Sequence, residues 1–275
     1  MIRPIKALVI RNLIKLKRDK MKLFLNIFMS GLFLFIFSFV IKSTAVGVEH
    51  PMNYLISGII IMTVFQSSLT NSMNILEDIS TGFMKEILVA PIFRWQIAIG
   101  HVLSATIISF LQGIIIVIIG FFMGLSINFL NGLEMIGLML LVGLTFSSLG
   151  LYLATISKES GNFQLLIAII SFPLTFLSGA YIPTMALPNL IQPLVYLNPL
   201  TYTTAAFRFI SLDMGNMSSE ALVKAGIAFN IFGFTITPFY SVLAIFTMCF
   251  IFFNLCVKRF NYADFSRVKV FRHKH

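Results

Sequence analysis

Residues 97–124 read IAIGHVLSATIISFLQGIIIVIIGFFMG and contain no Asp, Glu, Lys or Arg. Because an α-helix rises about 1.5 Å per residue, about 20 mainly apolar residues are enough to cross the hydrocarbon core of a bilayer. A charged side chain at the centre of such a helix costs about 2.5–3.5 kcal/mol. The stretch therefore predicts a membrane-spanning helix rather than a helix buried in a soluble core.

Similar stretches without charge recur along the chain. Together they predict six spans, at about 23–41, 52–76, 97–124, 135–157, 162–177 and 238–257. The composition agrees, since 58% of the 275 residues are hydrophobic and only 11% are charged, whereas a soluble domain carries about 25% charged residues. We predict an all-α fold, a polytopic membrane protein with six transmembrane helices and one transmembrane domain over residues 1–275.

The basic residues set the expected orientation, because cytoplasmic loops of membrane proteins are enriched in Lys and Arg. Eight of the 20 basic residues precede Leu23 and six follow Val257. Both termini are therefore expected in the cytoplasm, with the connections at 77–94 and 158–159 on the same side. The basic residues expected outside are Lys42, Arg208 and Lys224. We predict a multi-pass protein of the cell membrane, whose net charge of +10 contacts lipid headgroups and not nucleic acid.

The two ends of the chain predict cytoplasmic elements beside the membrane. Residues 1–22 are expected to form an interfacial helix, with basic side chains between apolar ones at helical spacing. The apolar positions are Ile5, Leu8, Val9, Leu13 and Leu16. No cleavable signal peptide is indicated, because the first apolar run is itself of span length and lacks a convincing cleavage site. Residues 258–275 predict a basic cytoplasmic tail.

Small residues on two predicted spans indicate close helix packing. Gly143, Ser147, Gly150 and Ala154 share one face of the fourth span, and Gly120 and Gly124 form a similar pair on the third. Small side chains let helix backbones approach closely in membranes. The contact can lie within the subunit or against a partner, and the sequence leaves both open.

The stretch from 160 to 207 is too long for one crossing and carries no charge. A span at 162–177, kinked at Pro173, uses its first part. Prolines beyond it interrupt any second span, and the even number of spans also excludes a full crossing. Residues 178–224 therefore predict an external re-entrant and loop region, whose irregular backbone must be covered by protein or water. Such a region is a candidate gate.

The chain lacks the motifs of self-driven transporters and of the commoner enzymes. It contains no Gly-Lys pair, and hence no Walker-type loop for ATP, and neither H-E-x-x-H nor G-x-S-x-G. Secondary transporters typically carry ionisable residues deep in the membrane, whereas the only candidate here is His101, near the inner surface. No metal site is predicted, and Cys249 and Cys256 lie too far apart on one helix for a disulfide. We therefore expect a non-catalytic conduit driven by another subunit.

Residues 77–94, EDISTGFMKEILVAPIFR, resemble the connection between the second and third spans of ABC-2-type transporter permeases. In that family a short amphipathic coupling helix at this place docks in a cleft of the ATPase subunit. Polar contacts are expected from the charged side chains, an apolar patch from Met84, Ile87 and Leu88, and a stiff end from Pro91. The resemblance implies that the ATPase-coupling residues are Glu77, Asp78, Thr81, Gly82, Met84, Lys85, Glu86, Ile87, Leu88 and Pro91.

A second match lies in the predicted external region. The sequences SGAYIP at 178–183 and LNPLTY at 197–202 are similar to the re-entrant region of the same family. The resemblance covers nearly the whole chain and is closest to the drug-resistance and nodulation-factor exporter branch. It implies an external gate made of Gly179, Tyr181, Pro183, Pro188, Asn198, Pro199, Leu200 and Tyr202.

The resemblance implies the permease subunit of an ATP-driven ABC exporter. Two permeases, identical or related, are expected to pair with separate ABC ATPase subunits. ATP and Mg are bound by those subunits, so no cofactor is expected in this chain. The substrate class is an amphiphile, namely a drug, a lipid or a lipid-linked glycan, moved out of the cytoplasm or the inner leaflet. The alternatives are an ATP-independent channel or secondary transporter, and a membrane-embedded enzyme or scaffold.

Overall fold

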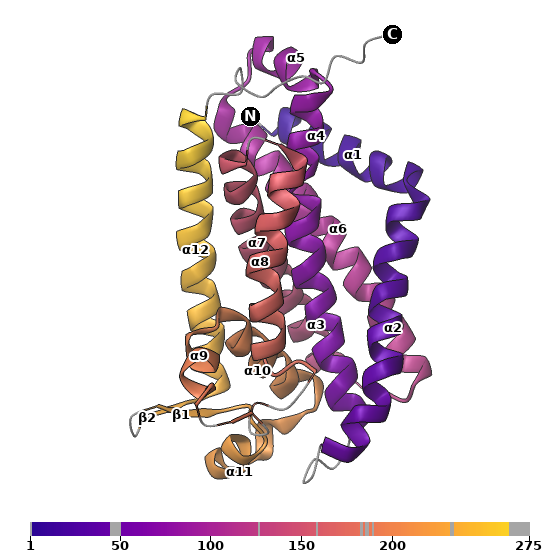
Figure 1. Cartoon of the computed structure of the whole chain (residues 1–275), viewed down its shortest axis with the longest axis vertical. Helices are drawn as coiled ribbons and strands as arrows, with labels where there is room; N and C mark the ends of the chain where they lie inside the picture. The colour runs from indigo at the N-terminus through magenta and orange to yellow at the C-terminus, as the bar shows by residue number, and fades with distance from the viewer. Residues whose placement is uncertain are drawn as a thin grey trace.

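The computed structural model describes residues 2–44, 51–125, 127–157, 159–181, 184, 187–188, 190–231 and 234–263. Within these ranges the chain forms an elongated bundle of long helices that run along one axis (Figure 1). Pro183 of the predicted gate and most of the predicted basic tail lie outside the described residues.

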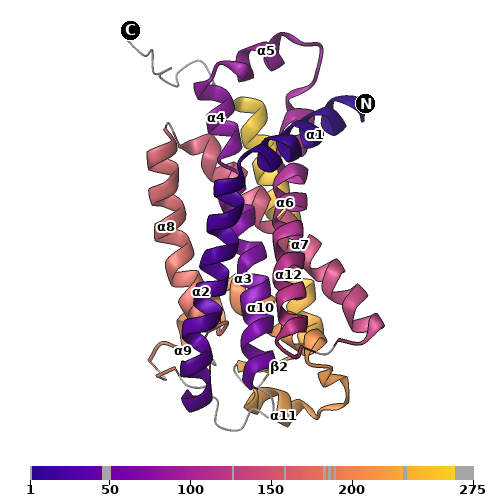
Figure 2. The same cartoon turned by 90° about the vertical axis from the view of Figure 1, so that its right-hand side faces the viewer.

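The long helices are flanked by short elements at both ends of the bundle (Figures 1 and 2). The order is α1 (Arg3–Arg18), α2 (Lys20–Thr44), α3 (Pro51–Asn71), α4 (Asn74–Ser80), α5 (Phe83–Val89), α6 (Arg94–Phe122), α7 (Phe129–Ile156), α8 (Ser160–Leu177), α9 (Gln192–Leu197), α10 (Pro199–Ser211), η2 (Met214–Asn216), α11 (Ser219–Lys224), β1 (Phe229–Ile231), β2 (Phe234–Ile236) and α12 (Pro238–Tyr262). We call the end formed by α1, α4 and α5 the α5 end, and the end formed by α9, α10, α11 and the strands the α10 end.

The all-α prediction is confirmed, with one small addition. Strands β1 and β2 pair antiparallel, with Phe229 opposite Ile236. Each strand has only three residues, and strands of that length leave little alternation to detect in the sequence.

Five segments of the described chain are long and apolar enough to cross a membrane: Pro51–Ser80, α6, α7, α8 and α12. The sixth candidate combines α1 and α2, which are bent by 72° relative to one another. The structure thus supports a multi-pass protein with five or six spans, and the number six stays a prediction. The fourth span was expected to begin after Glu134, but α7 begins at Phe129, because Glu134 is exposed and its carboxylate need not be buried.

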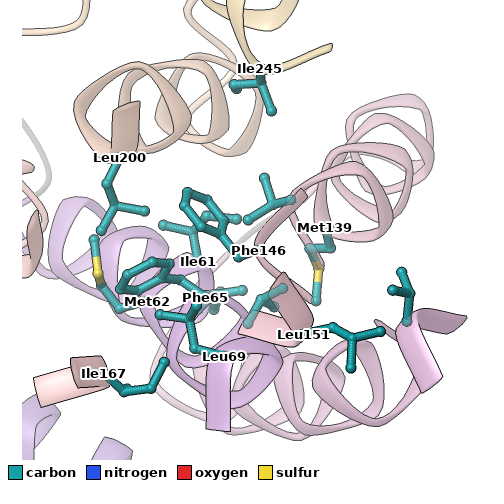
Figure 3. Packing of buried hydrophobic residues seen from close by; sticks show 14 of the residues in the cluster. Ile61, Met62, Phe65, Leu69, Met139, Phe146, Leu151, Ile167, Leu200 and Ile245 are labelled. Atoms are coloured by element: carbon teal, nitrogen blue, oxygen red, sulfur yellow. The ribbon is translucent and has the colours of Figure 1, made fainter. Parts of the chain in front are cut away.

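Helix α3 lies at the centre of the bundle. In Pro51–Ser80, 83% of the most apolar stretch is buried, against 17% for α8 and 22% for α12. Figure 3 shows Phe65 of α3 beside Phe146 of α7, whose rings meet edge to face with centroids 4.6 Å apart. Since α8 and α12 bury so little, they face lipid or another subunit.

The small residues of the fourth predicted span do allow close packing, and they do so within the subunit. A Cβ added at Gly150 would lie 2.6 Å from Ser72 Oγ, and one at Gly143 would lie 3.0 Å from Ser109 Oγ. At Gly120 a Cβ would approach the Ile56 side chain to 2.8 Å. The predicted pairing of Gly120 with Gly124 is wrong, because Gly124 lies beyond the end of α6 with a φ of +98°. It serves the left-handed turn and not helix packing.

Candidate functional site

Helices α4 and α5 form the tip of the α5 end. They are joined at Gly82, whose φ of +81° lies in the left-handed region that glycine adopts without strain. Helix α5 covers seven residues and projects beyond the long helices (Figure 2). The predicted coupling segment is therefore a helix–turn–helix at one end of the bundle.

Helix α1 is held against this segment by ion pairs. Arg11 donates from both terminal nitrogens to the two carboxylate oxygens of Asp78, each at 2.7 Å. The Arg11 guanidinium also lies 3.7 Å from the ring centroid of Phe83, and Lys15 pairs with Glu77. Only 1% of the Asp78 side chain is exposed, so its charge depends on these neighbours for compensation. Glu77 and Asp78, both predicted to contact an ATPase, thus have partners within the chain.

Helix α1 also packs closely on α6. Asn12 Nδ2 donates to Ser104 Oγ at 3.0 Å, and both residues are buried. Leu8 fills the space beside Gly100, where a Cβ would lie 2.9 Å from Leu8 Cδ1. His101 Nε2 lies 3.7 Å from Asp78 Oδ2, in the same buried cluster. The predicted interfacial helix is therefore also docked on protein, and Asn12 is the polar contact that the amphipathic pattern did not indicate.

The apolar patch predicted on the coupling segment needs correction. Met84 and Ile87 are buried against the bundle core, and the partly buried Leu88 packs on the same cluster. The exposed residues from the turn before α5 to the start of α6 form a different set, namely Thr81, Lys85, Glu86, Val89, Ala90, Pro91, Phe93 and Arg94. The large apolar side chains among them, Val89 and Phe93, are 87% and 64% exposed. The family resemblance implied an amphipathic helix here, but it could not tell which side of the helix faces inward.

At the α10 end, a buried arginine binds backbone carbonyls. Arg208, on α10, donates at 2.7 Å to the carbonyl oxygens of Gly179 and Ala180, and at 3.3 Å to that of Tyr54. Its guanidinium carbon lies 3.4 Å from the Tyr54 ring centroid. Within the described ranges no carboxylate lies within ion-pair distance of it. Arg208 was expected in the external loop, at the end of the segment that resembles the re-entrant region of the ABC-2-type permeases, whereas it lies on α10. An ionisable residue among uncharged segments is itself a signal of function.

The close approach of the turn after α8 to α3 depends on Gly58. A Cβ at this position would lie 2.3 Å from the carbonyl oxygen of Ala180 and 2.9 Å from Arg208 Nη2. Gly179, beside the turn, has a φ of +80°. Two glycines and one arginine thus hold the turn against the central helix.

Four other predicted gate residues lie in the first turns of α10 and at its N-cap. Asn198 caps α10 by accepting from the Leu200 amide at 2.9 Å, and its Nδ2 donates to the Leu174 carbonyl at 2.8 Å. Leu200 is fully buried. Tyr202 donates to the Tyr196 carbonyl at 2.6 Å, Pro199 begins α10 and Pro188 is exposed.

Tyr181 joins the turn to α2. Its ring stacks on Phe37 and Phe33 of α2, with centroids 4.7 and 5.3 Å apart. Only 7% of Tyr181 is exposed. The structure therefore brings Gly179, Tyr181, Asn198 and Leu200 together under closed packing, while Pro188 lies away from it at the surface.

A cleft of about 450 Å³ lies along the bundle between α2, α3 and α8. Its lining combines amide and hydroxyl side chains with phenylalanines, and Tyr181 closes it toward the α10 end. The floor is formed by Gln112 of α6. Apart from Tyr181, these residues were not singled out in the sequence, because isolated Gln and Asn in apolar stretches carry no spacing signal.

The protein family of this chain follows from its similarity to known families. Residues 3–212 match the family model described as ABC-2 type transporter. The chain belongs to the ABC-2 type transporter family. It is therefore a multi-pass permease subunit. ABC-2 permeases work with ATPase subunits, and the matched domain itself contains no ATPase domain.

Three relatives illustrate the similarity of this ABC-2 permease to other chains. It is 28% identical over 231 residues to ycf38 of Cyanophora paradoxa, named as a transport permease, with 81% of this chain and 79% of the relative covered. It is 26% identical to the inner membrane transport permease YadH of Escherichia coli, covering 60% and 65%. It is 25% identical to YbhR of the same species, named as a multidrug ABC transporter permease, covering 53% and 40%.

Proposed function

We propose that this ABC-2 permease is the membrane subunit of an ATP-driven exporter, and that a separate ATPase docks on the exposed side of α5. The observation that carries the proposal is the projecting helix α5, which shows charged and apolar side chains together, Lys85 and Glu86 beside Val89. Such a mixed patch is typical of a protein interface. ATP and Mg bind to the partner subunit, and Asp78 and Glu77 act by fixing α4 to α1 rather than by touching the ATPase.

The excess of basic residues at both termini supports a cytoplasmic position for the α5 end. Arg94 Nη1 donates to the carbonyl oxygens of Asn261 and Ala263, at 3.1 and 2.9 Å. These bonds join the end of α12 to the start of α6, so α1 and the end of α12 lie at the same end of the bundle. The α10 end is then external, and its closed turn is the proposed gate.

The permease is proposed to act as a pair, with itself or with a related chain. The exposed faces of α2 and α8 flank the cleft, and α8 buries only 17% of its most apolar stretch. A second permease on these faces would enclose the cleft between two subunits. The cargo is an amphiphile, a class that includes the drugs indicated by the name of YbhR.

Reversing the charges on α5 tests ATPase docking. We expect the double variant Lys85→Glu with Glu86→Lys to lower co-purification of the ATPase subunit at least about tenfold, because like charges then face one another across the interface. Pull-down in mild detergent and ATP turnover of the recovered complex measure this. The matched control is Glu220→Lys on α11, an exposed acid at the other end.

Two results would contradict this proposal. One is wild-type assembly and ATP turnover in the double variant, which would remove α5 from the interface. The other is export by the purified permease alone, driven by an ion gradient.

Cysteine accessibility tests the gate. In a background lacking Cys249 and Cys256, Leu200→Cys should be unreactive toward an external, membrane-impermeant maleimide, because Leu200 is fully buried. Trapping the complex with ATP should raise its labelling rate at least about tenfold, if opening exposes the site as local unpacking does. Leu197→Cys is the control, since Leu197 is already 79% exposed and should react in both states. Equal labelling of Leu200→Cys with and without ATP argues against a gate here.

A further inference from the structure

The cleft contains buried amide groups that have no hydrogen-bond partner. Gln112 is fully buried, and within the described ranges neither its Oε1 nor its Nε2 has a partner. Nor does the buried Nδ2 of Asn26, on α2, among the same residues. Both side chains line the cleft. A buried polar atom without a partner is unfavourable and uncommon in native proteins, so these three atoms indicate a ligand with groups that both donate and accept.

The lining of the cleft mixes polar and aromatic side chains. Along α3, Thr63, Gln66 and Thr70 recur at helical spacing and form a polar strip. Helix α8 contributes the rings of Phe172 and Phe176 together with the polar side chains of Gln164, Ser171 and Thr175. No Asp, Glu, Lys or Arg is among the lining residues that the structure describes. A molecule with an apolar body and a polar end can contact both kinds of side chain at once.

Because the described lining carries no charged side chain, the cleft favours an uncharged head group over a charged one. An anionic or cationic group placed in the cleft would lose water without gaining an opposite charge, which is costly at membrane depth. A hydroxyl or amide group would gain hydrogen bonds from Gln112 and Asn26 and would carry no such cost.

We propose that this cleft binds amphiphiles with an uncharged, hydrogen-bonding head group, such as a hydroxyl-bearing or glycosyl-bearing lipid. Gln112 and Asn26 bind the head group, and the phenylalanines of α8 contact the chain. The inference rests on the proposed function, because it names the substrate class of the same permease. Water alone is the competing occupant, but the rings of Phe172 and Phe176 offer water none of the hydrogen-bond partners that buried water needs.

Photolabelling with matched lipids tests the head-group preference. The full-length permease in phosphatidylcholine nanodiscs is irradiated with one of three probes that share a diazirine-bearing acyl chain. The probes are a diacylglycerol, a phosphatidic acid and a trimethylammonium-propane lipid, and mass spectrometry measures labelling of the peptides that line the cleft. We expect the neutral diacylglycerol to label these peptides at least about fivefold more than either charged probe. Equal labelling, preference for a charged probe, or no cleft labelling by any probe overturns the proposal.

A substitution at Gln112 separates binding from structure. Gln112→Leu should lower labelling by the neutral probe about tenfold, the effect of about 1.4 kcal/mol of lost binding energy. The same variant should unfold at an unchanged or higher temperature, because it removes an amide that lacked a partner. The control is Asn254→Leu, a polar residue exposed on α12, which should leave labelling unchanged. Unchanged labelling in Gln112→Leu, or a parallel fall in labelling and unfolding temperature, contradicts the proposal.

The labelling experiment contains neither ATPase nor nucleotide, so its outcome is independent of the exporter role. Unselective labelling of a permease that still couples to its ATPase overturns the head-group inference alone. Selective labelling of a permease that never binds an ATPase overturns the exporter proposal and leaves the binding site in place.

Discussion

Replacing Arg208 by methionine should destabilise the permease by about 3 kcal/mol or more, the sum of roughly two hydrogen bonds from a charged donor. Methionine fills much of the same volume, but it leaves the carbonyls of Gly179 and Ala180 without their donors at 2.7 Å. It also removes the guanidinium from the face of Tyr54. Because Cys249 and Cys256 are both buried, a thiol-reactive fluorophore can report unfolding of the otherwise native chain during heating.

Two further variants control this prediction. Arg3→Met changes an exposed arginine and should leave the unfolding temperature unchanged. Arg208→Lys should be intermediate, because an ammonium cannot reproduce the planar fork that spans two carbonyls and stacks on a ring. An Arg208→Met protein that unfolds at the wild-type temperature would show that the buried guanidinium does not hold the turn.

Replacing Arg11 should lower the free energy of unfolding more than replacing its partner Asp78. In Arg11→Ala the carboxylate of Asp78, 1% exposed, stays buried with Lys15 at 4.0 Å as its nearest cation, and breaking a buried pair in this way costs about 3–5 kcal/mol. In Asp78→Ala the arginine is 32% exposed and can turn to water, so we expect only about 1–2 kcal/mol.

The same heating assay measures both variants, and Lys6→Ala, an exposed change on α1, is the control. ATP turnover in the reconstituted complex should fall in the same order, since α4 loses its support from α1. The reverse order of unfolding temperatures, with Asp78→Ala the weaker protein, would contradict the assigned roles of the two charges.

Long-range organisation was largely predictable from the sequence, because spans are set by length and by the cost of burying charge. Residues 97–124 predicted α6 to within three residues at each end. Pairings across the fold were not predictable in this way. Arg11 and Asp78 are 67 positions apart, and nothing in their local spacing indicates that they meet.

For the predicted coupling segment, the sequence indicates a place in the chain but not the orientation of its helix. The place follows from the charges between two spans, but α5 has only seven residues, and apolar side chains occur on both its faces. Which face turns inward depends on the neighbouring elements, among them α1, whose Arg11 lies over the ring of Phe83. The contacts of Arg208 could not be predicted for a related reason, since its partners are carbonyl groups and the sequence does not reveal where backbone atoms point.

The segment Pro51–Ser80 connects the two ends of the bundle and is held at both of them. Arg11 binds Asp78 at one end, and Arg208 lies over Tyr54 at the other, roughly 36 Å away at about 1.5 Å per residue. The helix is interrupted only at residues 72–73, between α3 and α4. At that break Ser72 Oγ donates to the Ser147 carbonyl at 3.1 Å, where Gly150 leaves room for it. A displacement of α4 is therefore expected either to be absorbed by bending at residues 72–73 or to be transmitted along α3 to Tyr54 and Arg208.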